Sequence, residues 1–253
     1  MIFFKKILPF ISGLGCILVL ELFINFPTEW LFFLILLLFI IFFTTLFINS
    51  FKININFFGF IVSPVIFSIS GYLSLFFLER ESLKQIIIAV VFVGLLIFWG
   101  NMVSFLWNKA RYIPYALENI SSYMNLLAAF FIFVSSFNFF ILGVGRIRYL
   151  MFLIFITVLA LSWQTLWINK IEHKSRKYFP YIFALIFIEL FWVMHYLPTS
   201  YLVTAIILTT VFYTVNNITR FHLLDNLTNK VIIRYTVIST LVIISALLTA
   251  SWT

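Results

Sequence analysis

The chain has 253 residues, of which 64% are hydrophobic and only 9% are charged. This composition leaves too few polar side chains to cover a water-soluble globule, so we exclude a soluble fold. The formal net charge of +8 comes from cations that lie between apolar runs, a pattern that indicates membrane topology and not affinity for nucleic acid.

Long apolar runs follow one another along the chain without the alternation that is typical of a β-barrel strand. A transmembrane helix needs about 20 apolar residues, whereas a barrel strand needs about 9–11. We therefore predict an all-α fold, a polytopic transmembrane helix bundle of about nine spans that forms a single transmembrane domain over residues 1–253. The predicted spans are 7–26, 29–49, 55–78, 85–107, 120–143, 148–168, 178–197, 199–217 and 233–252.

The first span follows Lys5 and Lys6, a pair of cations that also precedes secretory signal sequences. The apolar run continues past Glu21 without a small-residue cleavage site, so we expect an uncleaved span with Glu21 near its outer end. Cys16 is the only cysteine, which excludes an internal disulfide and a thiolate metal cluster. Gly13 stands where lipoprotein processing needs a large aliphatic residue, so we expect Cys16 to pack within the span.

The third span carries small residues on one helical face. Gly59, Ser63, Ser70 and Ser74 fall within about 60° of one another, which predicts close packing against another helix. Pro64 removes one backbone donor and predicts a kink at this point. A helix broken at a transport site is the alternative interpretation.

The seventh span contains Glu189 near its middle, where an ionised carboxylate costs several kcal/mol in a bilayer. One hypothesis makes Glu189 a protonated structural residue that hydrogen-bonds to a neighbouring span. The other gives it a role in moving protons or cations. His195 near the end of this span is predicted to lie at the interface, and Pro198 marks a tight external turn before the eighth span.

The Lys and Arg residues predict the orientation, because cations accumulate in the short loops on the cytoplasmic side of the membrane. With the N-terminus inside and the C-terminus outside, twelve cations fall inside and four, Arg80, Lys84, Arg146 and Arg148, fall outside. The inner twelve are Lys5, Lys6, Lys52, Lys109, Arg111, Lys170, Lys174, Arg176, Lys177, Arg220, Lys230 and Arg234. The abundance of Phe, Ile, Asn and Lys indicates an AT-rich bacterial genome, so we expect a multi-pass protein of the bacterial inner (cytoplasmic) membrane.

Two cytoplasmic segments combine charge with other features. The basic turn at 172–177 is explained by topology, although such clusters also attract anionic head groups. The segment 220–234 mixes charges with leucines, and we predict an elbow along the interface before the ninth span.

Motifs of the common hydrolases, nucleotide-binding proteins and dinucleotide-binding proteins are absent from the sequence. We expect no catalytic residue, no cofactor and no metal site. On the outer face, Glu29, Glu79 and Glu81 could form an acidic group, and Arg146 and Arg148 could bind an anion. Ordinary solvated loop charges are the simpler interpretation of both groups.

The His195 to Thr199 turn, the 220–234 segment and the closing Thr249-Ala250-Ser251-Trp252 resemble a group of uncharacterised bacterial multi-spanning membrane proteins. The resemblance covers roughly the last 65 residues. It implies a shared fold and carries no activity, so no site residue is transferred from it.

Three classes of function fit these observations. The first is a non-catalytic membrane or envelope-complex component, whose partners are the lipid bilayer and other membrane proteins. The second is a secondary transporter or channel that uses Glu189, with further polar residues lining its cavity. The third is an intramembrane enzyme on a lipid-linked substrate, which would gather Glu79, Glu81 and a histidine at one face.

Overall fold

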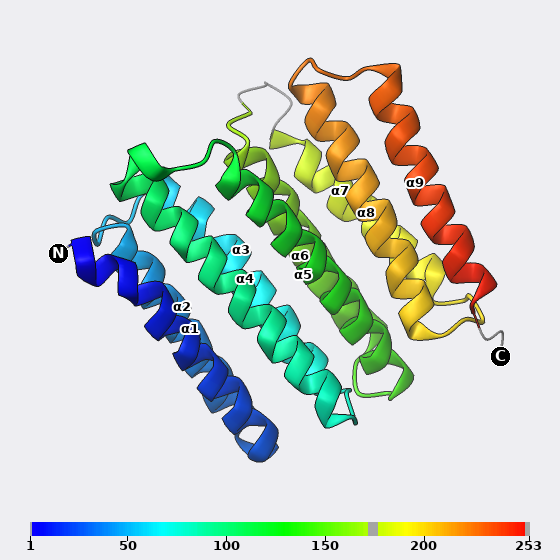
Figure 1. The fold of residues 1–253 in the computed structure, drawn as a ribbon. Helices are drawn as coiled ribbons and strands as arrows, with labels where there is room; N and C mark the ends of the chain where they lie inside the picture. The colour runs from blue at the N-terminus through cyan, green and yellow to red at the C-terminus, as the bar shows by residue number, and fades with distance from the viewer. Residues whose placement is uncertain (1, 172–176, 251–253) are drawn as a thin grey trace. The chain divides into compact units, whose positions relative to one another are not determined.

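The computed structural model describes residues 2–171 and 177–250, and these residues form nine α-helices and no strand (Figure 1). The helices are α1 (Ile2–Asn25), α2 (Trp30–Ile48), α3 (Ile55–Leu75), α4 (Glu81–Trp107), α5 (Ala116–Ile141), α6 (Ile147–Ile168), α7 (Phe179–Met194), α8 (Tyr201–Leu223) and α9 (Asn229–Leu248). Short 3₁₀ turns occupy Pro27–Glu29 and Lys109–Arg111. The predicted all-α fold is confirmed, and each predicted span overlaps one helix.

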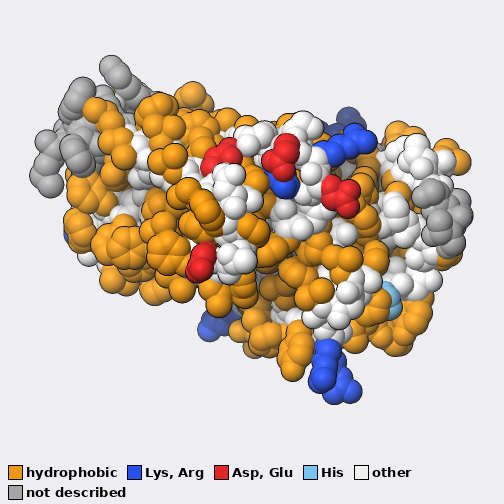
Figure 2. Space-filling model, turned by 90° about the horizontal axis from the view of Figure 1, so that it is seen from below, with side chains coloured by type: hydrophobic (Ala, Val, Ile, Leu, Met, Phe, Trp, Pro, Cys, Tyr) orange, Lys and Arg blue, Asp and Glu red, His pale blue; other side chains and the backbone are white. Residues whose placement is uncertain are grey.

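Eight of the described helices are long and apolar enough to cross a membrane. The exception is α7, which is apolar but only 16 residues long. Hydrophobic side chains also cover much of the surface drawn in Figure 2, as expected for a protein whose solvent is lipid.

Local sequence explains where several helices begin and end. Pro27 lies two residues after the end of α1 at Asn25, and a proline cannot continue a helix without loss of a backbone hydrogen bond. The side chain of Asn54 accepts a hydrogen bond from the Phe57 N–H at 3.0 Å and so caps the start of α3. Thr228 caps α9 in the same way through the Val231 N–H.

The cap at Thr228 shortens the cytoplasmic connection that the sequence predicted between the last two spans. Helix α8 continues to Leu223 and α9 begins at Asn229, so the 220–234 segment consists mainly of two helix ends. Only residues 224–228 remain for an interfacial elbow. Most of the basic turn at 172–177, and Ser251 and Trp252, lie outside the described residues.

The chain divides into two compact units, Met1–Ala128 and Ala129–Thr253, with the boundary inside α5. Within the first unit, α1 packs against α2 and α4, and α3 packs against α2 and α4. Two glycines allow close approach to α4. A Cβ atom on Gly13 would lie 2.8 Å from the Phe92 ring, and one on Gly71 would lie 2.7 Å from Val91.

Hydrogen bonds from aromatic side chains join the helices of the first unit. The Tyr72 hydroxyl donates to the backbone carbonyl of Trp30 at 2.7 Å, and the Trp107 indole N–H donates to that of Ile48 at 2.9 Å. Ile48 is the last residue of α2, so its carbonyl has no partner within that helix. The bond to Ile48 matters most, because an unpaired backbone group in hydrocarbon costs several kcal/mol. The bond to Trp30 adds a second contact at the start of α2.

Aromatic packing and hydroxyl contacts hold the second unit together. Phe187 of α7 stacks on Phe133 of α5, with ring centroids 6.1 Å apart. Thr214 of α8 hydrogen-bonds to Ser239 of α9. The Asn216 amide of α8 donates to the hydroxyl of Thr165 in α6 at 3.4 Å.

Candidate functional site

The outer face of α7 places a carboxylate in the middle of an exposed apolar surface. Glu189 is exposed, and other exposed side chains lie within about 60° of it around the helix axis. They are Tyr178, Ile182, Leu185, Ile186, Trp192, Val193 and Tyr196. We call these residues, with Glu189, the α7 outer face.

The opposite side of α7 holds the helix in the second unit. Phe183, Phe187 and Phe191 recur every four residues, so they share one face, and all three are buried. The Phe191 ring packs on Phe137 with centroids 4.7 Å apart, and the Phe187 ring meets Phe212 at 5.7 Å. This packing fixes the rotation of α7 and thereby directs Glu189 outward.

Glu189 has neither a hydrogen bond nor an ion pair with any residue in 2–171 or 177–250. An ionised carboxylate in hydrocarbon costs several kcal/mol unless a partner or a proton neutralises it. The α7 outer face therefore presents a carboxyl that forms no hydrogen bond or ion pair with the described residues of the second unit.

The other two intramembrane candidates occupy different settings. Glu21 is half-buried on α1, where its backbone carbonyl accepts a hydrogen bond from the Asn25 amide at 2.9 Å. His195 is half-buried at the end of α7, and its ring meets Phe140 edge-on with centroids 3.7 Å apart. The Tyr196 ring lies 5.3 Å from the same imidazole. His195 is thus held by aromatic rings at one end of its helix.

The small residues of α3, Gly59, Ser63, Ser70 and Ser74, are all buried. The Ser63 hydroxyl donates to the side-chain carbonyl of Asn125 in α5 at 2.7 Å. The hydroxyls of Ser70 and Ser74 bond to backbone carbonyls of their own helix. Ser63 therefore links two helices, whereas Ser70 and Ser74 contribute small volume to a buried face.

The charged residues around α4 form no larger cluster in the described part of the chain. Glu79 and Glu81 are exposed, and Glu81 pairs with Lys84 at 2.7 Å in the first turn of α4. Over residues 2–171 and 177–250, no group of three or more His, Cys, Asp or Glu side chains could hold a metal ion.

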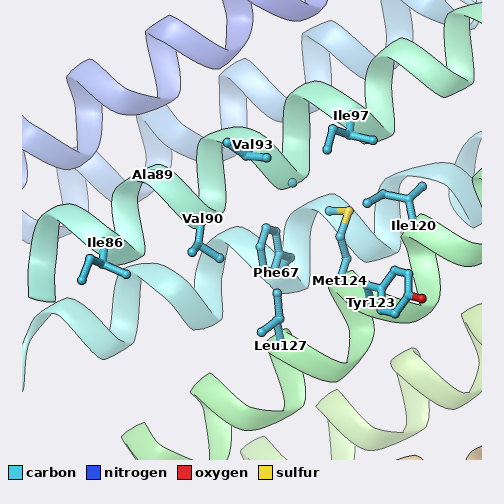
Figure 3. Close-up of a pocket in the computed structure, with 11 residues that line it drawn as sticks. Phe67, Ile86, Ala89, Val90, Val93, Ile97, Ile120, Tyr123, Met124 and Leu127 are labelled. Carbon is cyan, nitrogen blue, oxygen red and sulfur yellow. The ribbon is translucent and has the colours of Figure 1, made fainter.

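A second feature, which the sequence analysis missed, is an apolar groove in the first unit (Figure 3). Its volume is about 410 Å³, and its walls come from α4 and α5 with Phe67 of α3 between them. The α4 wall consists of Ile86, Ala89, Val90, Val93, Gly94 and Ile97, and the α5 wall of Ile120, Tyr123, Met124 and Leu127. The only sequence signal for it is the series of small and branched residues along one face of α4.

The comparisons with known proteins place the chain in a family. A family model described as a protein of unknown function, DUF5656, matches residues 49–249. The chain belongs to the DUF5656 family. No curated protein and no solved structure matches it.

The DUF5656 match is much longer than the C-terminal resemblance noted from the sequence. It begins directly after α2 and extends through α9. Glu189, His195, the small residues of α3 and the whole groove lie within the DUF5656 region, whereas Glu21 precedes it.

Proposed function

We propose that this protein is a non-catalytic component of a complex in the cytoplasmic membrane of a bacterium. It docks a transmembrane helix of a second protein on the α7 outer face. The partner helix supplies a hydrogen-bond donor or a cation at the depth of Glu189. The N-terminus lies in the cytoplasm and the C-terminus outside.

The single observation that carries this proposal is the exposed position of Glu189 within the α7 outer face. From Tyr178 to Tyr196 this face extends for about 27 Å at 1.5 Å per residue, close to the hydrocarbon thickness of about 30 Å. Tyrosines at both ends are typical of residues that lie at the two membrane interfaces. The face is thus only slightly shorter than the hydrocarbon layer, and its polar group lies near the middle.

A docking role also fits the neighbours of Glu189 better than a transport role does. A transport site near the bilayer midplane needs several polar groups around a cavity. Leu185, Ile186, Trp192 and Val193 are the exposed neighbours of Glu189 one turn away on α7, and the indole N–H of Trp192 is the one polar side-chain group among them. A lone carboxyl among apolar side chains suits a helix contact, where one hydrogen bond across helices contributes about 1 kcal/mol.

Site-specific photo-crosslinking tests the docking role in intact membranes. A benzophenone amino acid replaces Val193, which is 55% exposed on the α7 outer face, and Phe152, which is 62% exposed on α6, serves as the control position. We expect Val193 to crosslink to one membrane protein that has a polar residue within a transmembrane helix, and Phe152 not to do so.

Substitutions of Glu189, made in the protein that carries the benzophenone amino acid at Val193, test whether the carboxyl takes part in docking. Glu189→Gln should retain the crosslink and the biological activity, because the amide still forms hydrogen bonds, whereas Glu189→Leu should abolish the crosslink at equal membrane levels. Crosslinks only to lipid, or to residues 1–128 of the same chain, would refute docking. Loss of activity in a normally accumulating Glu189→Gln variant would favour the transporter.

A further inference from the structure

A series of cations and aromatic rings joins α8 to α9 on either side of the connection 224–228. The guanidinium of Arg220, in the last turn of α8, lies 5.5 Å from the centre of the Phe221 ring. The Phe221 ring meets the Tyr235 ring of α9 with centroids 6.0 Å apart. The guanidinium of Arg234 in turn lies 5.2 Å from the centre of the Tyr235 ring. Both distances are within the range of cation–π contacts, so two guanidinium groups lie on the pair of rings that joins the helices.

The cations of this region have no anionic partner. Arg220, Lys230 and Arg234 form no ion pair and no side-chain hydrogen bond with any residue in 2–171 or 177–250. Arg220 is half-buried, and its Nε–H is buried without an acceptor in these residues. Asp225 is the only carboxylate in the 220–234 segment, and it is exposed in the connection without an ion pair. The region therefore has a net positive charge.

The start of α9 adds to this positive charge. The N-terminus of a helix carries a partial positive charge that favours anions, yet the first turn of α9 has no acidic residue and contains Lys230. Lys230 and Arg234 are four residues apart, so they share one face of the helix, and both are exposed. Like charges at this spacing repel each other. A bound anion would relieve both unfavourable interactions.

The cations lie where two apolar helices end. Arg220 is in the last turn of α8 and Lys230 is in the first turn of α9, and both helices are long and apolar enough to cross a membrane. The ends of such helices lie at the level of the lipid head groups, where Lys and Arg side chains meet phosphate. An anion of the bilayer itself is therefore within reach of these cations.

The face of α9 that carries Arg234 continues as an apolar surface. Val237, Leu241 and Ile244 follow Arg234 at spacings of three or four residues, so they lie on the same side, and all three are exposed. Acyl chains cover such a surface in a bilayer. A phospholipid combines a phosphate with an acyl chain and thus matches both parts of this face, whereas a free phosphate matches only the cations.

Topology accounts for the number of cations but not for their arrangement. The positive-inside rule depends on how many Lys and Arg residues a connection holds and not on what their side chains contact. Arg148, in the first turn of α6, shows the difference, because it is exposed and lies on no ring of the described residues. The ring contacts of Arg220 and Arg234 are thus a separate property of the connection between α8 and α9 (Figure 1).

We propose that this region binds the head group of an anionic phospholipid in the leaflet that contains the end of α8. Lys230 and Arg234 form charge-assisted hydrogen bonds with the phosphate, and Arg220 adds its charge across the ring pair. The acyl chain lies along α9. We call Arg220, Phe221, Lys230, Arg234 and Tyr235 the α8–α9 cationic site. It is separate from the α7 outer face and depends neither on the docking of a partner nor on the orientation of the chain.

Native mass spectrometry of the purified full-length chain tests the site, because it counts the lipids that stay bound when detergent is removed. The chain is titrated with phosphatidylglycerol and with phosphatidylcholine of the same acyl chains. We expect phosphatidylglycerol to bind about tenfold more tightly, since two or more cations attract its net charge. Excess inorganic phosphate should not displace it. Equal binding of the two lipids would overturn the head-group assignment, and displacement by inorganic phosphate would overturn the lipid assignment.

Matched variants separate the α8–α9 cationic site from net charge. Arg234→Gln should weaken phosphatidylglycerol binding about tenfold, because it removes a charge-assisted contact with the phosphate. Arg148→Gln makes the same change of charge at another exposed arginine near a helix start and should leave binding unchanged. Tyr235→Leu keeps every charge but removes the ring beneath Arg234, so it should weaken binding about threefold.

The outcomes of these substitutions decide the proposal. Equal effects of Arg234→Gln and Arg148→Gln would show that anionic lipid responds to the net charge of the chain alone, and would overturn the site. Unchanged binding in a folded Tyr235→Leu variant would refute the role of the ring pair. If Arg234→Gln does not give a monodisperse protein, Lys230→Gln replaces it and should weaken binding in the same direction, since Lys230 is also exposed.

Discussion

At the scale of single residues, the position of a polar side chain decides whether it hydrogen-bonds within the fold or is available to another molecule. Tyr112, in the connection between α4 and α5, is a structural example. Its hydroxyl donates to the Glu118 carboxylate at 3.0 Å and accepts from the Leu117 N–H at 3.3 Å. Glu189, in contrast, forms no hydrogen bond or ion pair with the described residues and is exposed.

Tyr112 should make stability depend on pH in the alkaline range. Burial raises the pKa of its phenol above the ordinary value of about 10, the hydrogen bond and charge of Glu118 raise the pKa further, and the Leu117 N–H lowers it. The folded state therefore keeps the phenolic proton more tightly than the unfolded state does. The resulting stability is fully present below pH 10 and is lost as the pH rises through the raised folded-state pKa.

We expect Tyr112→Phe to cost about 1–2 kcal/mol at neutral pH, since it removes both hydrogen bonds of the hydroxyl, and to reduce the loss of stability above about pH 10. Thermal unfolding of the detergent-solubilised protein between pH 7 and pH 11 measures both effects. Parallel stability curves for the two proteins across this range would show that the Tyr112 phenol does not contribute to the alkaline transition.

At the scale of secondary-structure elements, α3 is the helix whose small residues matter most for packing. Ser70 is fully buried, and its hydroxyl bonds to the Phe67 carbonyl of the same helix at 2.9 Å. Ser245 of α9 makes the same kind of bond, to the Val242 carbonyl at 2.8 Å, but is exposed. The two serines therefore differ mainly in the space around them.

Ser70→Leu should destabilise the protein by about 1–3 kcal/mol, because a larger side chain must be forced into a packed interior. The control Ser245→Leu loses an equivalent hydrogen bond but adds its side chain at an exposed position, so we expect little change. Melting of both variants in the same detergent gives the comparison. Equal melting temperatures would place the Ser70 side of α3 against lipid.

At the scale of the whole molecule, charge predicts the topology. In the first unit Lys52 and Lys109 lie in connections that follow α2 and α4, whereas Glu29 and Glu79 lie in connections that follow α1 and α3. Successive helices of this unit alternate in direction, so Lys52 and Lys109 lie at one end of the unit, whereas Glu29 and Glu79 lie at the other end together with Arg80 and Lys84 (Figure 1). The positive-inside rule predicts that the end with Lys52 and Lys109, where the sequence also places Lys5 and Lys6, is cytoplasmic.

A reporter that is active only outside the cytoplasm should therefore work when fused after Thr253 and fail when fused within 109–117 or 170–177. The outcome after Thr253 depends on α7, whose 16 residues must complete a crossing together with the turns around it. If the reporter is active within 170–177 and inactive after Thr253, the orientation is the reverse of the predicted one. If the reporter is inactive at all three sites, the C-terminus is cytoplasmic and the chain has one crossing fewer than predicted.

The sequence by itself determined the number and approximate bounds of the helices. Run length is a local property, and a membrane requires about 20 apolar residues for each crossing regardless of how the helices pack. The Thr228 cap shows the limit of this argument, since the hydropathy pattern placed the start of the last span four residues after the observed start of α9 at Asn229. A side-chain cap is a single hydrogen bond that a hydropathy pattern does not contain.

For helices without a small-residue pattern such as that of α3, only the tertiary structure decided which side is buried. In water, the apolar face of a helix reveals the buried side, but in lipid both faces are apolar and the hydrophobic effect does not distinguish them. The sequence therefore located Glu189 at the middle of its span, while the packing of Phe187 and Phe191 turned its side chain outward. The groove arises in the same way, from the contact of Gly94 with Phe67, two residues that are far apart in the sequence.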